Sequence, residues 1–439
     1  MSDPSVRERM REDWNRRARE DANYYAAFGR REQNDDEFLD TGAHLVTRME
    51  EELKRLPARA NRRAWRALEI GCGPGRLMKP LSRNFGEIHG VDVSDVMIAL
   101  ARERLAGIPQ AHVHATDGTD LSMFADDSFD FVYSYAVFQH IPDPRIITGY
   151  MHEIRRVLKP GGVFRGQFNG LPQVGKQRPD TWTGSRIDAS EIRAFTRDHG
   201  LDLLELSDVN TQYLLTTWHK RHPDTSPLAE PENTATVRRI TNSVSSEPAV
   251  TPRGRYSAIA LWVENLPDAC ELNSLTARVD GREANPFYVG PAAYDGSRQL
   301  GVYLPAGTRT GLLPISVEWN GRTLLKAVVR VIPQGPPLPR VVALSDGIDL
   351  LSTGEITSGL IKLITEEMDQ PSLFSATVSG RPVDRAHFTV TDPVPPRCVF
   401  DFSLPAAIAS GEHVLEVRYG TRCFVFPITV IGPDRRKPA

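Results

Sequence analysis

The feature that most constrains the fold is an apolar run that ends in three glycines on alternate positions. Residues 68–77 read Leu-Glu-Ile-Gly-Cys-Gly-Pro-Gly-Arg-Leu, which places the glycines at Gly71, Gly73 and Gly75. Glycine accepts positive φ and lets a ligand approach the backbone where a Cβ would block it. The pattern therefore predicts a buried strand that leads into a nucleotide-type binding turn and then into a helix.

Around this turn, short apolar runs alternate with stretches of helical periodicity. Strands are predicted at 67–70, 88–93, 113–115, 129–135 and 162–168, and helices at 94–105, 145–158 and 189–199. Strands separated by helices indicate parallel βαβ units in a doubly wound, Rossmann-like α/β sheet. Two further apolar runs, 201–206 and 212–218, predict an antiparallel hairpin at the sheet edge. In such a sheet, ligands bind beyond the carboxyl ends of the strands.

The chain of 439 residues is too long for a single core, and its composition changes along its length. A charged segment at 1–60 predicts a helical N-terminal lid, followed by the α/β domain at 61–220 and a linker at 221–236. After the linker, helical periodicity disappears. Two all-β units are predicted, at 237–334 and 338–434, because Ala277–Arg282 matches Ala376–Arg381 and Val317–Trp319 matches Val417–Tyr419. We call these units the first and the second β repeat; their size is typical of immunoglobulin-like sandwiches.

Charge and cysteine usage narrow the class of protein. Lys and Arg number 53 against 56 Asp and Glu, so nothing directs the whole chain toward nucleic acid or an anionic membrane. No apolar run approaches the ~20 residues that span a bilayer, and the polar N-terminus is unlike a secretory signal. The four cysteines lack zinc-ligand spacing, so no metal is expected. We interpret them as reduced thiols of a cytoplasmic protein; a Cys398–Cys423 disulfide is the less favoured alternative.

Two acidic residues narrow the class of ligand that the glycine turn is predicted to bind. Asp92 ends the second predicted strand and Asp117 follows the third, where carboxylates can accept ribose hydroxyls and an adenine amine. The glycine spacing differs from the G-x-G-x-x-G dinucleotide fingerprint, and no Gly-Lys-Ser/Thr follows to hold a triphosphate. A neutral or cationic nucleoside is therefore preferred over NAD or ATP.

With these motifs, the chain resembles the class I S-adenosylmethionine-dependent methyltransferases, of the type-11 small-molecule kind, over roughly residues 60–220. The resemblance rests on 69–75, 91–94, 129–132, 139–144 and 158–162. It implies S-adenosyl-L-methionine as the cofactor. By the resemblance, the following residues would surround that cofactor: Gly71, Cys72, Gly73 and Gly75 at the methionine moiety, Glu69 at its amino group, Asp92 at the ribose, Val93 and Met97 beside the adenine, Asp117 and Gly118 at the adenine edge, and Ser134 and Tyr135 near the sulfonium.

Methyl transfer from a sulfonium needs alignment and dehydration more than it needs protein chemistry. His140 and Tyr135 are the candidate catalytic residues; His140 could be a base for a protic acceptor, although a structural role in its loop is slightly favoured. In the lid, Trp14 and Arg17 are candidates for the cofactor mouth, where Arg17 could pair with the methionine carboxylate or remain a solvated surface residue. Met97 could equally be a core residue. Asp143 and Pro144 are predicted to cap and begin the helix near 145.

The sequence says less about the methyl acceptor than about the cofactor. Residues 134–137 read Ser-Tyr-Ala-Val where enzymes that methylate base or glutamine amino groups usually carry Asp/Asn-Pro-Pro-Tyr/Phe, so nucleic acid is not expected as a partner. A small-molecule, lipid-precursor or glycan acceptor is preferred. The β repeats resemble bacterial immunoglobulin-like (IPT/TIG-like) modules, which implies either a spacer or homodimer surface or the recognition of a glycan or protein partner. A non-catalytic adaptor and an NAD oxidoreductase remain the alternative functions.

Overall fold

The computed structural model of the chain describes residues 4–27, 31–57, 64–171, 179–222, 235–335, 338–347, 354–384, 386–392, 397–406 and 408–431. The chain divides into two compact units. The first comprises Met1–Ala22 and Leu39–Gln334, and the second comprises Asn23–Phe38 and Gly335–Ala439. Most of the predicted linker at 221–236 lies outside the described residues.

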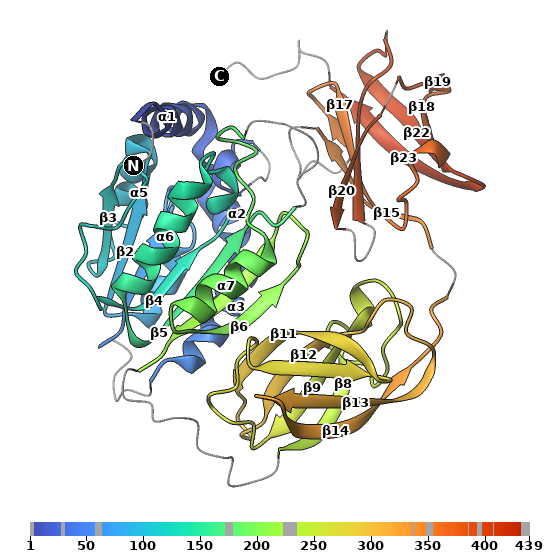
Figure 1. The fold of residues 1–439 in the computed structure, drawn as a ribbon. Helices are drawn as coiled ribbons and strands as arrows, with labels where there is room; N and C mark the ends of the chain where they lie inside the picture. The colour runs from blue at the N-terminus through green and yellow to red at the C-terminus, as the bar shows by residue number, and fades with distance from the viewer. Residues whose placement is uncertain are drawn as a thin grey trace. The chain divides into compact units, whose positions relative to one another are not determined.

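The first unit contains the predicted α/β sheet, whose strands follow the order β3-β2-β1-β4-β5-β7-β6 (Figure 1). The strands are β1 (Arg66–Ile70), β2 (Glu87–Asp92), β3 (Ala111–Ala115), β4 (Phe129–Ser134), β5 (Leu158–Phe168), β6 (Leu201–Ser207) and β7 (Leu214–Lys220). The first five pair in parallel, whereas β7 is antiparallel to both of its neighbours. The prediction of a mixed Rossmann-like sheet is therefore confirmed, with small shifts at the strand ends.

Helices cover both faces of this sheet because successive side chains of a strand point to opposite sides. Leu68 and Ile70 of β1 join one hydrophobic cluster with α6 and α7, whereas Ala67 joins another with α3, α4 and α5. The helices are α1 (Pro4–Ala27), α2 (Asp35–Asp40), α3 (Ala43–Glu52), α4 (Met78–Leu81), α5 (Asp95–Arg104), α6 (Pro144–Val157) and α7 (Ala189–Asp198), with 3-10 turns η1 (Leu53–Arg55) and η4 (Phe138–His140). As predicted, Asp143 caps α6, accepting a hydrogen bond from the Arg145 N–H at 2.9 Å.

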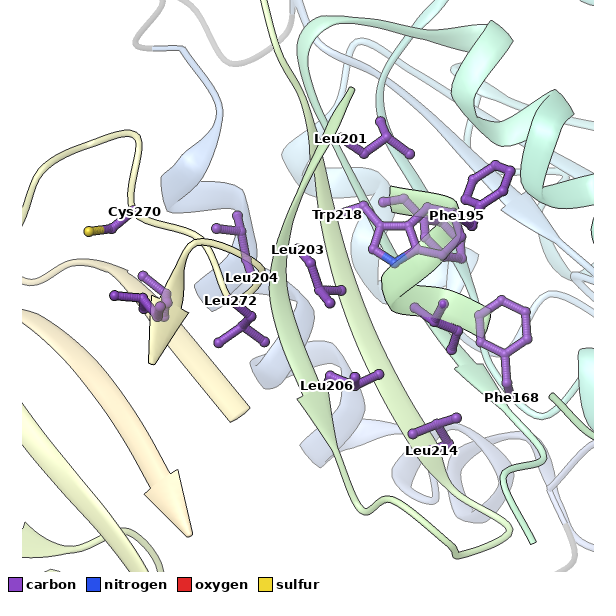
Figure 2. Close-up of a cluster of buried hydrophobic side chains, with 14 of the residues drawn as sticks. Phe168, Phe195, Leu201, Leu203, Leu204, Leu206, Leu214, Trp218, Cys270 and Leu272 are labelled. Atoms are coloured by element: carbon purple, nitrogen blue, oxygen red, sulfur yellow. The ribbon is translucent and has the colours of Figure 1, made fainter. Parts of the chain in front are cut away.

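The predicted hairpin forms, but it does not end the sheet. Strand β6 continues into the first β repeat, where Tyr288 of β11 pairs antiparallel with Glu205. The Leu272 N–H also donates to the Leu203 carbonyl at 2.8 Å. Figure 2 shows Leu204 on the side of β6 that faces Leu272, while Leu203 and Leu206 lie on the side of Trp218. The expectation of an edge hairpin was wrong because the edge of β6 bonds to another part of the chain.

The first β repeat contributes seven strands to the first unit. They are β8 (Thr236–Asn242), β9 (Ala258–Glu264), β10 (Leu275–Val279), β11 (Arg282–Ala292), β12 (Arg298–Tyr303), β13 (Gly311–Trp319) and β14 (Arg322–Val331). Their inward side chains belong to the same hydrophobic cluster as β6 and α7. The α/β sheet and the first β repeat therefore share one hydrophobic core.

The second unit holds the second β repeat, built from a four-stranded sheet β15-β17-β21-β20 and a five-stranded sheet β16-β23-β22-β18-β19. The strands are β15 (Arg340–Asp346), β16 (Glu355–Ile356), β17 (Leu360–Glu366), β18 (Phe374–Val378), β19 (Arg381–Pro382), β20 (His387–Asp392), β21 (Arg397–Ser403), β22 (Gly411–Tyr419) and β23 (Arg422–Val430). Side chains of both sheets form one hydrophobic cluster. The region is all β, and its immunoglobulin-like character stays a prediction.

The two repeats pair equivalent strands in equivalent registers. Leu275 lies opposite Trp319 in the first, and Phe374 lies opposite Tyr419 in the second.

All four cysteines are free. The part of the chain that the structure describes contains no helix long and apolar enough to cross a membrane, and no group of side chains arranged to hold a metal ion.

Candidate functional site

The glycine turn after β1 adopts a backbone that only glycine accepts easily. Gly71, Gly73 and Gly75 have φ values of 70°, 49° and 85°. The turn is held by the Gly71 N–H, which donates to the Val91 carbonyl of β2 at 2.8 Å. A Cβ on Gly71 would lie 2.3 Å from a methyl carbon of Val137, so this position cannot carry a side chain.

Asp92, at the carboxyl end of β2, directs its carboxylate to this turn. One oxygen accepts the Gly73 N–H at 2.9 Å and the other accepts the Ser94 N–H at 2.8 Å. Burial raises the pKa of Asp92, and these backbone hydrogen bonds oppose the rise. A carboxylate has about four acceptor positions, so Asp92 can still accept from a donor such as a hydroxyl of a ribose.

Glu69 lies beneath the same turn and is almost fully buried, at 3% exposed. The Tyr133 hydroxyl donates to its Oε2 at 3.0 Å. Burial raises the pKa of Glu69 to about 8, although the Tyr133 hydrogen bond and the charge of Arg76 lower it. The carboxyl group therefore carries its proton at neutral pH in this structure.

The residues predicted at the adenine edge lie under helix α1. Asp117 pairs with Arg7, with Oδ2 2.7 Å from Nη1, and its Oδ1 accepts the Thr119 N–H at 3.0 Å. Gly118 has no room for a side chain, since a Cβ there would lie 2.9 Å from Val93 Cγ2 and 3.2 Å from Met10 Cε. Val93 is half-buried, and Met97 is 2% exposed within the core.

Helix α1 also reaches the start of α5, a contact that sequence reasoning missed. The Asn15 Oδ1 accepts the Ser94 hydroxyl at 2.7 Å and the Val96 N–H at 3.2 Å. Arg7 was missed as well. Neither residue carried a recognisable signal, because both belong to a segment that is polar throughout.

The sequence candidates Trp14 and Arg17, also on α1, gather with His140. The Trp14 and His140 rings meet edge to face at 5.3 Å. The Arg17 guanidinium lies over the Trp14 ring at 4.8 Å and over the Trp182 ring at 5.0 Å. It donates to the Thr181 carbonyl at 3.2 Å and to the Thr181 hydroxyl at 3.1 Å. Arg17 thereby joins α1 to the 179–185 segment.

His140 is buried with both ring nitrogens engaged. Its Nδ1 lies 2.8 Å from the Trp182 carbonyl, so Nδ1 carries the proton and donates it. Its Nε2 lies 3.1 Å from the Gln139 side-chain amide nitrogen and accepts from it. Burial lowers the pKa of His140 to about 4, so the ring is neutral at physiological pH.

The residues at the end of β4 have distinct environments. The Ser134 hydroxyl donates to the Ile70 carbonyl at 2.9 Å. Burial raises the pKa of Tyr135 to about 12, so its phenol stays protonated. The Cys72 thiol packs in the hydrophobic cluster that contains Met78, and burial raises its pKa well above the ordinary value. Cys72 therefore contributes its backbone to the glycine turn, while its side chain belongs to the hydrophobic cluster.

The structure thus brings three carboxyl groups to the carboxyl ends of neighbouring strands: Glu69, Asp92 and Asp117. The oxygens of such groups accept hydrogen bonds from hydroxyl and amine donors. The glycines keep the backbone open to that ligand. Phosphates would require the opposite charge at the turn.

Residues 68–165 match the protein family described as "Methyltransferase domain". The chain is 28% identical over 169 residues to a ubiquinone biosynthesis O-methyltransferase of Paramagnetospirillum magneticum, which covers 35% of this chain and 66% of that protein. It is 31% identical over 191 residues to the methyltransferase GfsG of Streptomyces halstedii, which covers 40% of this chain and 66% of that protein. The chain therefore spans slightly less than two thirds of these curated relatives.

Among solved structures, the magnesium protoporphyrin IX methyltransferase ChlM of Synechocystis PCC 6803 with bound S-adenosylmethionine aligns with 50% of this chain and 98% of its own. The sequence identity is 15% and the TM-score is 0.37. A TM-score of this size supports no conclusion about this chain. The family match supports S-adenosylmethionine as the cofactor, and the carboxyl groups and open glycines at the strand ends fit its hydroxyls, amines and positive charge.

Proposed function

We propose that residues 61–220 transfer the methyl group of S-adenosylmethionine to a small-molecule, lipid-precursor or glycan acceptor by in-line displacement. The family match at residues 68–165 supports methyl transfer. The single observation that carries the assignment to this site is the Asp92 carboxylate, held by the Gly73 and Ser94 amides beside a turn that admits no side chain. We further propose that the protein acts in the cytoplasm, with residues 1–60 as its lid and the β repeats serving recognition or assembly.

When bound, the cofactor supplies a methyl group already activated by a positively charged sulfur. The protein then has to bind, orient and exclude water. We assign Asp92 to the ribose hydroxyls, Glu69 to the amino group and Asp117 with Gly118 to the adenine edge. Helix α1 covers the adenine end through the Arg7–Asp117 pair, which supports its role as a lid.

For His140 we favour a positioning role over that of general base. Its Nδ1–H is committed to the Trp182 carbonyl and its Nε2 to Gln139, which supports a role in holding the 179–185 segment near the site. A group with a pKa of about 4 is also a weak base at neutral pH. Tyr135 remains a candidate for contact with the acceptor as a hydrogen-bond donor, because it keeps its proton.

The alternative function is an adaptor that binds the cofactor without turnover and uses the β repeats to bind a protein or glycan. No residue of the described site excludes it. Incubation of the full chain with methyl-labelled cofactor and an extract of small molecules and glycans separates the two functions. Transfer of label to a product supports the enzyme, and binding of cofactor with no labelled product supports the adaptor.

The Asp92→Asn variant tests the site itself. Asparagine keeps the shape but replaces the anion, so we expect cofactor affinity measured by calorimetry to fall about tenfold or more, since each lost charged hydrogen bond is worth ~1.5–3 kcal/mol. Asp95→Asn, on the exposed first turn of α5, is the matched control and should bind as the natural chain does. Equal affinity of the Asp92→Asn variant and the natural chain would contradict the proposed site.

A further inference from the structure

The two β repeats differ in the strand that follows their first hairpin. In the first repeat, β11 runs without interruption from its pairing with β10 to its pairing with β12. In the second, the equivalent segment forms two separate strands, β19 against β18 and β20 against β21. Residues 383–386 lie between them. One continuous strand therefore bridges two sheet edges in the first repeat, whereas the described residues 383, 384 and 386 of the second repeat belong to no strand.

A cavity of about 830 Å³ lies at this interruption. Three phenylalanines line it: the Phe374 and Phe400 rings stack at 4.0 Å, and the Phe388 ring lies 5.1 Å from that of Phe400. Thr377 also lines the cavity, and its hydroxyl is buried without a hydrogen-bond partner in the described part of the chain. The cavity is suited to an apolar group accompanied by a polar backbone.

In the first repeat, the same face is occupied by a strand of the α/β domain. Tyr288 pairs with Glu205 of β6, and the Leu272 N–H donates to the Leu203 carbonyl. Leu204 of β6 packs toward Leu272 (Figure 2). The occupant of this face is therefore an extended strand that presents an aliphatic side chain.

The strand registers show which residues of the second repeat are equivalent to this face. Tyr288 pairs with Gly301 in the first repeat and His387 pairs with Asp401 in the second, so Tyr288 and His387 are equivalent. Leu275 and Phe374 are also equivalent. Three residues before them in the sequence stand Leu272 and Pro371, which are therefore equivalent as well. His387 and Pro371 both line the cavity. The face on which β6 lies in the first repeat is thus the face that opens into a cavity in the second.

Charge adds to the description of the occupant. In the first repeat, Arg193 of α7 donates to the Leu272 carbonyl and to Asn285 Oδ1, both at 3.3 Å. Asn285 is equivalent to Asp384 at the cavity rim. Asp384 is exposed and forms no ion pair among the described residues. In the first repeat, Asn285 binds an arginine, and in the second repeat a carboxylate, that of Asp384, stands at the equivalent position. This carboxylate favours a basic side chain in the bound strand.

We propose that the second β repeat binds an extended segment of another polypeptide, which adds as a strand to the outer edge of β20. An aliphatic side chain of that segment enters the Phe374–Phe388–Phe400 cavity, and a basic side chain pairs with Asp384. Strand β20 is the last strand of its sheet, so its outer backbone groups are the ones that strand addition uses. This activity is independent of the proposed methyl transfer.

The test uses the full chain and a fluorescent peptide of alternating character, Arg-Leu-Thr-Leu-Arg-Leu-Thr-Leu-Arg, with binding followed by anisotropy. We expect saturable binding that Ala386→Phe weakens about tenfold, since Ala386 lines the cavity and the larger side chain would fill the space that the aliphatic side chain of the peptide has to enter. Asp384→Asn should weaken it several-fold. The matched control Ala409→Phe makes the same change at an exposed residue outside the cavity and should leave binding unchanged.

Three outcomes would overturn the proposal. They are the absence of saturable binding, binding that Ala386→Phe leaves intact, and equal binding of a peptide in which every arginine is glutamate. Binding of an apolar dye that Ala386→Phe abolishes, with no peptide binding, would assign the cavity to a small apolar ligand instead. Thermal unfolding of each variant, followed by circular dichroism, ensures that a lost signal comes from the surface and not from unfolding.

Discussion

Among the single residues of the site, Glu69 combines deep burial with a raised pKa. Its pKa of about 8 means that the ligand-free fold holds a proton there at neutral pH, while the unfolded chain, with an ordinary value of 4.5, does not. A cationic amino group brought next to this carboxyl would favour its ionised form. Cofactor binding is then coupled to the release of a proton.

We expect cofactor affinity to increase as the pH rises toward 8 and to level off above it, because less work is then needed to ionise Glu69. The Glu69→Gln variant should bind more weakly at pH 8 and lose this dependence. Calorimetry in buffers of different ionisation enthalpy measures the proton release directly. Glu103→Gln, at an exposed residue of α5, is the control. Identical pH profiles for Glu69→Gln and the natural chain would separate Glu69 from the amino group.

Between single residues and domains, the outer pair of parallel strands, β2 and β3, carries a cluster of three histidines. The His89 ring lies 5.0 Å from that of His112 and 5.6 Å from that of His114. His89 Nδ1 is 3.3 Å from His114 Nε2. Burial lowers the pKa of His89 to about 4 and lowers that of His114 as well. His89 and His114 are therefore harder to protonate in the fold than in the unfolded chain.

This cluster should make the fold sensitive to acid. Because the folded pKa of His89 lies below the ordinary value of 6.5, stability is complete above that pH and falls as the pH drops toward 4. We expect His89→Phe, which inserts a ring beside Phe124 and Phe129, to reduce this acid-dependent loss in urea unfolding. His44→Phe, at an exposed residue, should leave it unchanged. An equal loss in both variants would show that other groups cause it.

At the scale of the whole molecule, the α/β domain and the first β repeat form one compact unit with a shared hydrophobic cluster. Arg55 of η1 donates to the Val289 carbonyl of β11 at 2.7 Å, and its guanidinium lies 5.7 Å from the centre of the Tyr288 ring. Beneath this contact, the buried Arg165 bonds to Glu205 and to the Thr217 hydroxyl. Burial alone would raise the pKa of Glu205, but the Arg165 guanidinium keeps it below its ordinary value.

Removal of the first β repeat should therefore damage the α/β domain. A chain ending at Lys220 exposes the backbone edge of β6 and the Leu204 side chain, whose burial is worth ~2 kcal/mol. We expect it to aggregate or to unfold at lower temperature than a chain ending at Gln334, as measured by size-exclusion chromatography and thermal unfolding. A stable monomer ending at Lys220 would show that the shared core is dispensable.

The features that could be predicted from the sequence are those with a local chemical reason. The glycine turn, Asp92 and the alternation of strands and helices each follow from residue spacing. The pairing of β6 with β11 could not be predicted, since it joins segments more than eighty residues apart through one pair, Tyr288 and Glu205. The Arg7–Asp117 pair was likewise hidden, because Arg7 is one of many arginines in its segment.

The turn between β6 and β7 contacts segments of the candidate site. The Thr211 carbonyl accepts the Gly170 N–H at 2.9 Å, and the Gln212 carbonyl accepts the Gln167 side chain at 2.6 Å. Gln167 in turn contacts Gln139 at 2.9 Å, the neighbour of His140. Strand β6 thus connects the first β repeat, through this turn, to the segment that carries Gln139 and His140 of the candidate site. If residues 61–220 carry out the proposed methyl transfer, we expect substitutions in β11 to change its rate while cofactor affinity stays the same, although β11 lies outside the candidate site.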